Sequence, residues 1–336
     1  MIGFSLILLV GTAVAPADDV RPPQMLARYI RDGQFEPGDY RWMRGRFADA
    51  PPSERAAYRQ IQNYLGTCFK KATTEARAEL VAMGETAPAL PQAPYGDSLC
   101  GDIGFATGAP HQWSSWKAFA ADRAAAAPIT DSLLWAVDMA IAQGGPRGEN
   151  LDQKLLALPL GEQMLRTAGQ WQRGPTFSTR PPTLSPGARA IVDARLSMAM
   201  SARDGWDTQY LKKKIDEAGW PKISVVGSHA SDAAWLIVQH ADRAPAFQLK
   251  VLLLMEPLVA RGEVSKTNYA YLYDRIMLKL RGVQRYGTQM TCAAGQYVPL
   301  PLDESGELER RRSEVGLPNM ADYRRAMVAQ GGACPR

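Results

Sequence analysis

Long helical patterns with clear starts and stops account for most of the sequence. The pattern over 52–84 begins at Pro52, continues through Ser53 and Glu54, and stops at Gly84. The pattern over 265–282 starts at Ser265, a favoured helix cap, and stops at Gly282. Strand-like segments are short by comparison. The sequence therefore predicts a mainly α fold.

Further segments complete this predicted fold. Helical patterns cover 21–45, 113–125, 129–143, 153–172, 185–207, 207–220, 228–242 and 245–257, and two short helices end the chain. Two segments favour β structure: a strand-like piece at 222–227, and a short β-hairpin within 284–302 whose turn is supplied by Gly295. The expected fold is thus a helical N-terminal region followed by a helical C-terminal domain with a short β-hairpin.

A proline-rich segment at 173–187, with four prolines, is the best candidate for a linker. It divides a helical N-terminal region, 18–172, from a helical domain of unknown function, 188–331. Because such a linker carries few contacts, the sequence predicts that a fragment from about Thr183 onward folds alone.

The N-terminus resembles a secretory signal peptide. Residues 2–10 are almost wholly apolar, and the following small residues favour cleavage after Ala17, so that 1–17 is removed. The leader has no Lys or Arg, and the alternative is an ordinary buried element. No membrane span is predicted in the mature chain. The expected location is exported, either periplasmic or extracellular.

Four cysteines agree with export. We expect bridges Cys68–Cys100 and Cys292–Cys334, each within one half of the chain. No pair has C-x-x-C spacing, which excludes a zinc knuckle or a thioredoxin-type motif. If the protein is not exported, the alternative is four buried free thiols.

Charge and motifs exclude several classes of function. The 39 basic and 34 acidic residues are interspersed, which is typical of a solvated surface and predicts no nucleic-acid partner. No nucleophile elbow, phosphate-binding loop or dinucleotide fingerprint is present. His229 and His240 lie about 16 Å apart along one predicted helix, so they cannot bind one ion. We therefore predict no metal site and no cofactor.

One polar set remains as a candidate site. His240 ends an apolar helix, Asp274 is a plausible orienting group, and Arg275 is placed to neutralise it or to bind an anion. These three are the candidate catalytic residues. The candidate binding residues are Gln239, Asp242, Gln248, Gln284, Tyr286, Gly287, Thr288 and Gln289. The alternative is a satisfied core histidine beside a structural ion pair.

The strings "AGWPKISVVG", "WLIVQHAD", "FQ", "YLYDR" and "QRYGTQ" occur here in a specific order and spacing. Over about residues 190–323 the chain resembles an uncharacterised bacterial family, domain of unknown function 6624. The resemblance implies a helical domain with recurring polar positions, which match the candidate residues above. It implies no activity.

Two functions remain open from the sequence. One is a hydrolase or transferase that uses a His–Asp general acid/base pair. The other is a non-catalytic helical module that binds a peptide, a glycan or a partner protein. The ligand and the oligomeric state are not indicated by the sequence.

Overall fold

The computed structural model describes residues 20–108, 111–144, 148–169 and 183–334. The predicted signal peptide, 1–17, and most of the predicted linker lie outside the described residues. The N-terminal part contains η1 (Gln24–Tyr29), β1 (Ile30–Arg31), β2 (Gln34–Phe35), η2 (Arg41–Arg46), α1 (Pro52–Ala82), α2 (Ser98–Thr107), α3 (Trp116–Gly144) and α4 (Leu151–Ala168). The remainder contains α5 (Pro186–Ala218), α6 (Ile223–Val226), α7 (Ser228–His240), α8 (Pro245–Val259), α9 (Lys266–Arg281), β3 (Met290–Ala293), β4 (Gln296–Pro299), η3 (Ser305–Glu307), α10 (Leu308–Glu314) and α11 (Met320–Gly331).

The mainly α fold and the C-terminal hairpin are confirmed. Local signals set the helix ends as expected: the Ser265 side chain accepts the N–H of Asn268 at the start of α9, and Gly282 ends that helix with φ 75°. In the hairpin, β3 pairs antiparallel with β4 around Gly295, which also has a positive φ. These elements follow from residues that are close together in sequence.

Four sequence expectations about secondary structure are wrong. The helices expected at 185–207 and 207–220 are one continuous helix, α5. Residues 21–45 form 3₁₀ turns and a hairpin of two short strands, β1 and β2, because glycine and proline interrupt the helical pattern there. The strand expected at 222–227 is the short helix α6, whose Ser224 N–H is capped by the Glu263 carboxylate. The two helices expected at 113–143 are one, α3, since Pro128 lies on its exposed side, where a missing hydrogen bond is tolerated.

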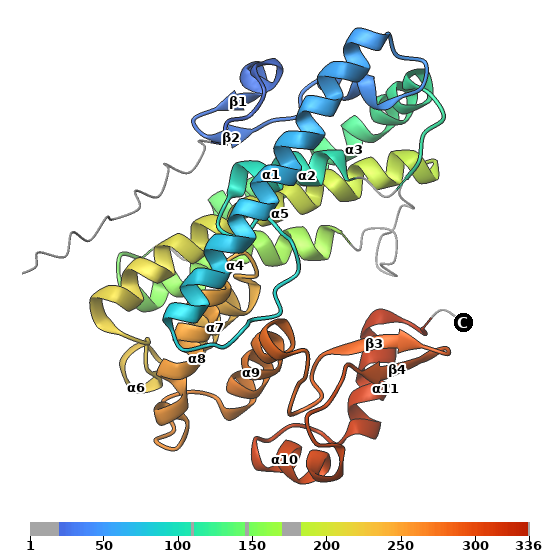
Figure 1. The fold of residues 1–336 in the computed structure, drawn as a ribbon. Coiled ribbons are helices and arrows are strands. Elements are labelled where there is room, and N and C mark those ends of the chain that lie inside the picture. Colours follow the sequence, from blue (N-terminus) through green and yellow to red (C-terminus); the bar gives the residue numbers. More distant parts are fainter. Residues whose placement is uncertain (1–19, 109–110, 145–147, 170–182, 335–336) are drawn as a thin grey trace, which may run out of the picture.

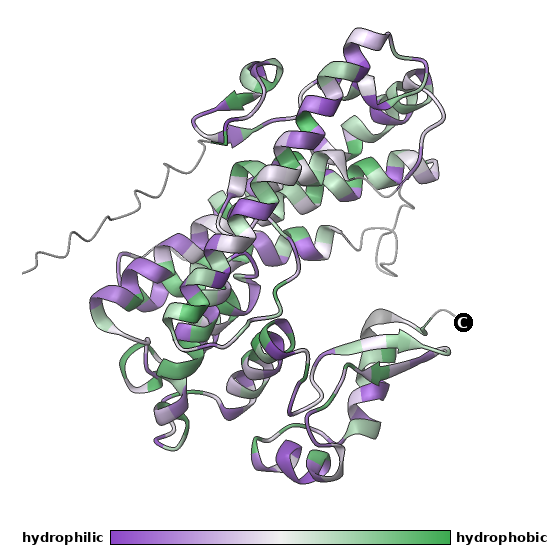
Figure 2. Ribbon diagram, viewed as in Figure 1, coloured by the Kyte–Doolittle hydropathy of each residue, from purple (hydrophilic) through white to green (hydrophobic). Residues whose placement is uncertain are grey.

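Helix α5 joins the two halves of the molecule (Figure 1). Its first half packs with α2 and α3 in one hydrophobic cluster, together with Ile61 and Phe119 of the N-terminal part. Its second half enters another cluster, where Leu80, Leu90 and Leu155 pack against α7–α9. Figure 2 shows helices with both hydrophobic and hydrophilic stretches, as expected when one face is buried. Many contacts therefore cross the predicted domain boundary, which contradicts the expectation of few.

Among the described segments, α3 is the one helix that is long and apolar enough to cross a membrane, judged by length and composition alone. In the fold it packs against α4 and α5.

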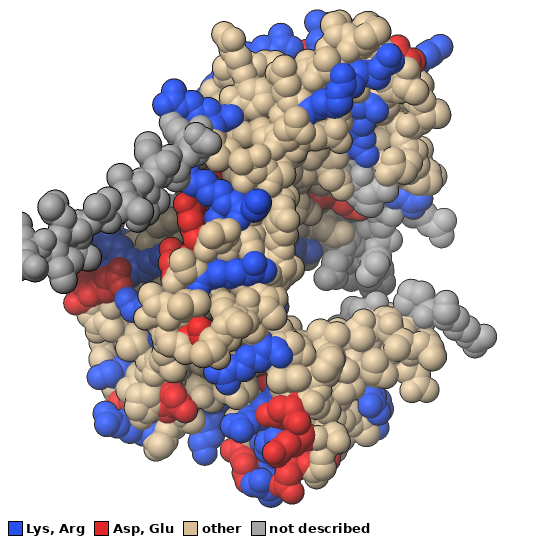
Figure 3. Space-filling model, viewed as in Figure 1, with Lys and Arg blue, Asp and Glu red and all other residues tan. Residues whose placement is uncertain are grey.

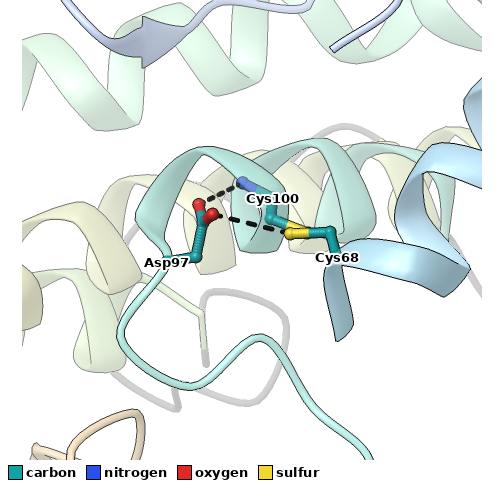
Figure 4. A group of neighbouring side chains, drawn as sticks. All are labelled: Cys68, Asp97 and Cys100. Atoms are coloured by element: carbon teal, nitrogen blue, oxygen red, sulfur yellow. Dashed lines mark hydrogen bonds between the residues drawn. A yellow bond between two sulfur atoms is a disulfide. The ribbon is translucent and has the colours of Figure 1, made fainter. Parts of the chain in front are cut away.

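Both predicted cysteine pairs are joined. Cys68–Cys100 connects α1 to α2, and Cys292–Cys334 connects β3 to the segment after α11. Figure 4 shows Asp97 beside the first bridge, where its carboxylate accepts the Cys100 N–H at 2.9 Å and caps α2. Two such bridges are typical of proteins that fold in an oxidising environment.

Candidate functional site

A cavity of about 420 Å³ lies where the N-terminal elements meet the turn between α7 and α8. Its wall combines β2, α2, α3, α4, α5 and that turn. The apolar part includes Phe35, Leu134 and Met198. The charged and titratable side chains that line it are Glu36, Asp102, Arg166, Arg195, Asp204, Lys212, His240, Asp242 and Arg243. A concave site with an apolar part and a few polar groups is the usual form of a ligand pocket.

His240, the last residue of α7, pairs with a buried glutamate on α4. Its Nδ1 lies 2.9 Å from Glu162 Oε1, and the Glu162 side chain is 2% exposed. Burial alone raises the pKa of Glu162, but hydrogen bonds from His240, Gln163 and Arg166 outweigh it and lower the pKa. An ionised Glu162 accepts a hydrogen bond from the N–H of Nδ1. In the neutral ring, Nε2 is then left as a hydrogen-bond acceptor. Glu162 is therefore the group that orients His240.

Asp204, on α5, stands beside this pair. One of its oxygens accepts a hydrogen bond from Arg166 at 3.2 Å, and the other is buried without a partner. Burial, only partly offset by Arg166, raises the pKa of Asp204 to about 7. The site thus holds the His240 imidazole and the Asp204 carboxyl group, and this carboxyl group exchanges its proton near neutral pH. The combination of the two groups suits acid–base chemistry.

Asp207, one turn further along α5, predicts a pH-dependent effect on stability. Burial and then Glu162 raise its pKa to about 7, and its Oδ2 has no partner. Since the pKa in the unfolded chain is about 4, the folded state loses relative stability as pH rises from about 4 to 7. We expect Asp207→Asn to stabilise the protein by about 1–3 kcal/mol at pH 8 and by little at pH 4. Urea titrations at both pH values measure this, and an equal effect at the two would contradict it.

The rim of the cavity depends on a glycine. Arg243 reaches across α2, where it hydrogen-bonds the Ser98 carbonyl, pairs with Asp102 at 3.5 Å and lies over the Phe105 ring. A Cβ on Gly101 would lie 2.2 Å from the Arg243 guanidinium. Gly101 therefore makes room for the side chain that joins α2 to the α7–α8 turn.

The groups at His240 are also types that bind metals. Glu162, Asp204 and His240 each offer one ligand atom, and these atoms lie within 4.8 Å of one another. The Arg166 guanidinium, however, contacts both carboxylates, so a divalent cation would have to displace a positive charge. Cys68 and Cys100, with Asp97, form another such group, but their sulfur atoms are joined in the disulfide. The arrangement at His240 therefore suits proton transfer better than metal binding.

Residues 188–333 match the model of a family of unknown function, DUF6624. The match extends the resemblance found in the sequence by two residues at its start and by ten at its end. No curated protein and no solved structure matches the chain. The matched residues, 188–333, are called the DUF6624 region. This region contributes Asp204 and His240 to the cavity, whereas Glu162 and Arg166 precede the region in the sequence. The site therefore combines the DUF6624 region with helices outside it.

The predicted pairing of His240 with Asp274 is wrong. Asp274 is fully buried in the DUF6624 region, and its carboxylate accepts the backbone N–H groups of Arg285, Tyr286 and Thr288 at 2.8–2.9 Å. A carboxylate with three backbone donors stabilises the loop that presents them. The reason that an aspartate occurs inside this helix is thus structural.

Arg275 has a partner other than the expected one. It forms two hydrogen bonds with the Asp242 carboxylate, and Lys279 binds the same carboxylate at 2.9 Å. Burial opposes ionisation of Asp242, but Lys279 and Arg275 outweigh it and lower the pKa to about 2. This group fixes the turn after His240, and it brings Asp242 to the cavity wall.

Two of the glutamines expected to bind a ligand, Gln248 and Gln284, bind the backbone instead. Gln248 Nε2 donates to the Val238 carbonyl, and its Oε1 accepts from Lys279. Gln284 donates to the carbonyls of residues 289 and 300, and accepts the N–H of Gln289. Gln239 is buried, and its Oε1 has no partner. None of these three lines the cavity.

The loop 285–289 does not border the cavity either. The buried Arg312 donates to the Tyr286 carbonyl, and Tyr323 donates to the Thr288 carbonyl. Gly287 has a positive φ, and its open side faces Leu308. The loop is therefore held between α9 and the C-terminal helices, and of the predicted site residues only His240 and Asp242 line the cavity.

Sequence reasoning missed Glu162, Arg166 and Asp204. The one local signal was the Glu162–Arg166 spacing of four residues, which is common on helix surfaces and indicates no site by itself. Nothing near them in the sequence pointed to His240.

Proposed function

We propose that the cavity is the active site of a hydrolase or transferase in which His240 is the general acid/base. The observation that carries this proposal is the His240–Glu162 contact at the cavity wall. With Nδ1 held by Glu162, Nε2 takes a proton from a water or hydroxyl nucleophile, and Glu162 stabilises the imidazolium that forms. Asp204 supports the same chemistry as a proton donor. The two disulfides support an exported location for this activity.

The test is an activity screen of the purified full chain against esters, phosphate esters, amides and glycosides, with three variants beside it. We expect His240→Gln to reduce any activity found by about 10²–10⁴-fold, because glutamine transfers no proton near neutral pH. His229→Gln is the matched control, since His229 is exposed on the same helix. Glu162→Gln tests the orienting role and is expected to lower the turnover number.

Two outcomes of this screen count against the proposal. One is an activity that His240→Gln leaves unchanged. The other is a loss of activity that a thermal melt shows to be a loss of folding.

A specific feature favours a second candidate, binding of a peptide or glycan without turnover. Phe105 and Trp206 line the cavity although they are 42% and 53% exposed. Exposed aromatic rings at a cavity rim offer flat contact surfaces for a ligand. If binding is the function, Trp206→Ala weakens ligand affinity while His240→Gln leaves it unchanged, as equilibrium titration with a peptide or glycan library will show.

A further inference from the structure

A second cavity, of about 490 Å³, lies between η2 and the first half of α1. Three arginines line it, Arg46, Arg55 and Arg59, and its lining contains no acidic residue. Figure 3 shows Lys and Arg side chains gathered on the upper part of the molecule, over the N-terminal end of α1. The cavity is therefore basic, unlike the mixed cavity at His240.

None of the three arginines forms an ion pair in the part of the chain that the structure describes. Arg46 donates to the Thr107 carbonyl at 2.7 Å, and Arg55 donates to the carbonyls of Ala48 and Ala50. Backbone carbonyls fix a guanidinium in place, but they do not neutralise it. The arginines at the His240 cavity differ, since Arg195 pairs with Glu36 and Arg243 with Asp102.

The close packing of η2 against α1 brings these side chains together. A Cβ on Gly45 would lie 1.9 Å from the Glu54 carbonyl oxygen, so only glycine lets η2 approach α1 this closely. That approach places Arg46 over the cavity beside Arg55 and Tyr58. Tyr58 is buried, and Arg46 acts to lower the pKa of its hydroxyl, which burial raises.

We infer that the Arg46–Arg55–Arg59 cavity binds a small soluble ligand through a phosphate-type oxyanion. Guanidinium groups donate paired hydrogen bonds that match such an anion, and each charged bond is strong where the groups are partly shielded from water. Arg46 and Arg55 are half-buried and Arg59 is exposed, so the anion would enter from solvent and contact Arg59 first. This site does not depend on the chemistry proposed for His240.

The experiment is calorimetric titration of the full chain with inorganic phosphate and with pyrophosphate, at constant ionic strength. We expect saturable binding that Arg59→Gln weakens by at least about tenfold, the effect of losing one charge-assisted hydrogen bond. Arg261→Gln, which removes an exposed arginine from another surface, is expected to have no effect. Thermal melts of both variants should match the parent, because the Arg59 side chain has no hydrogen bond or ion pair among the described residues and Arg261 is exposed.

Three outcomes would overturn the inference. They are no saturable binding of either anion, an equal loss in Arg59→Gln and Arg261→Gln, and binding to phosphatidylglycerol vesicles without binding of the free anions. Arg55→Gln provides a second measurement of anion binding, since it removes a charge from the cavity wall while α1 keeps its helical hydrogen bonds.

Discussion

A fragment of residues 183–336 is expected to show no cooperative thermal transition. It contains the whole DUF6624 region, but it lacks the N-terminal side chains that complete the cores. Leu80, Leu90, Tyr95 and Leu155 are each at most 8% exposed in the cluster around α7–α9. Losing four such side chains removes about 6–12 kcal/mol, which is comparable with the whole stability of a typical domain. Circular dichroism during heating, with a dye that binds exposed apolar surface, measures the outcome.

The full chain is the control for this experiment. Because α5 runs through both hydrophobic clusters, we expect the full chain to melt in one transition seen alike by far- and near-ultraviolet circular dichroism. A fragment with a sharp melt and native near-ultraviolet signals would show instead that the C-terminal part folds alone, as the proline-rich segment first suggested.

Glu162→Ala is expected to lower the free energy of unfolding by about 3–5 kcal/mol at pH 7. Glu162 is 2% exposed and binds His240, Gln163 and Arg166, so its removal takes an acceptor from three polar groups, of which Arg166 keeps a second one, Asp204. Glu162→Gln keeps the shape and part of the hydrogen bonding, and should cost less. Since the folded pKa of Glu162 is lowered, its contribution is present above about pH 4.5 and is lost as pH falls below that value.

The matched control is Glu149→Ala, because Glu149 precedes the same helix and pairs with Lys154 while its side chain is 95% exposed. A change within about 0.5 kcal/mol is expected there. Urea unfolding at pH 7 and pH 4 measures both variants. If Glu162→Ala costs less than about 1 kcal/mol at pH 7, the pair with His240 does not hold α4 against α7.

The candidate site shows which features of a site can be predicted from local sequence patterns. From the sequence, we expect the polar end of α7 to deliver His240 to a cleft formed with the Asp274 helix and the loop 285–289. His240 does line a cavity, but other elements form its walls. The prediction of Asp274 as the partner of His240 was wrong, because the Asp274 carboxylate binds three backbone N–H groups of a loop 11–14 residues later. A sequence shows that a buried carboxylate needs partners, but it does not show whether those partners are backbone or side chain.

By itself the sequence determined the elements that depend on near neighbours: the helix that begins after Ser265 and ends at Gly282, and the hairpin at Gly295. It also predicted the two cysteine pairs, whose members are 32 and 42 residues apart. Only the tertiary structure decided which residues meet across the molecule. Glu162 and His240 are 78 residues apart, and they meet because α4 packs against α7. Helix propensity and caps act over a few residues, while such packing depends on how every apolar face is buried at once, so no short pattern records it.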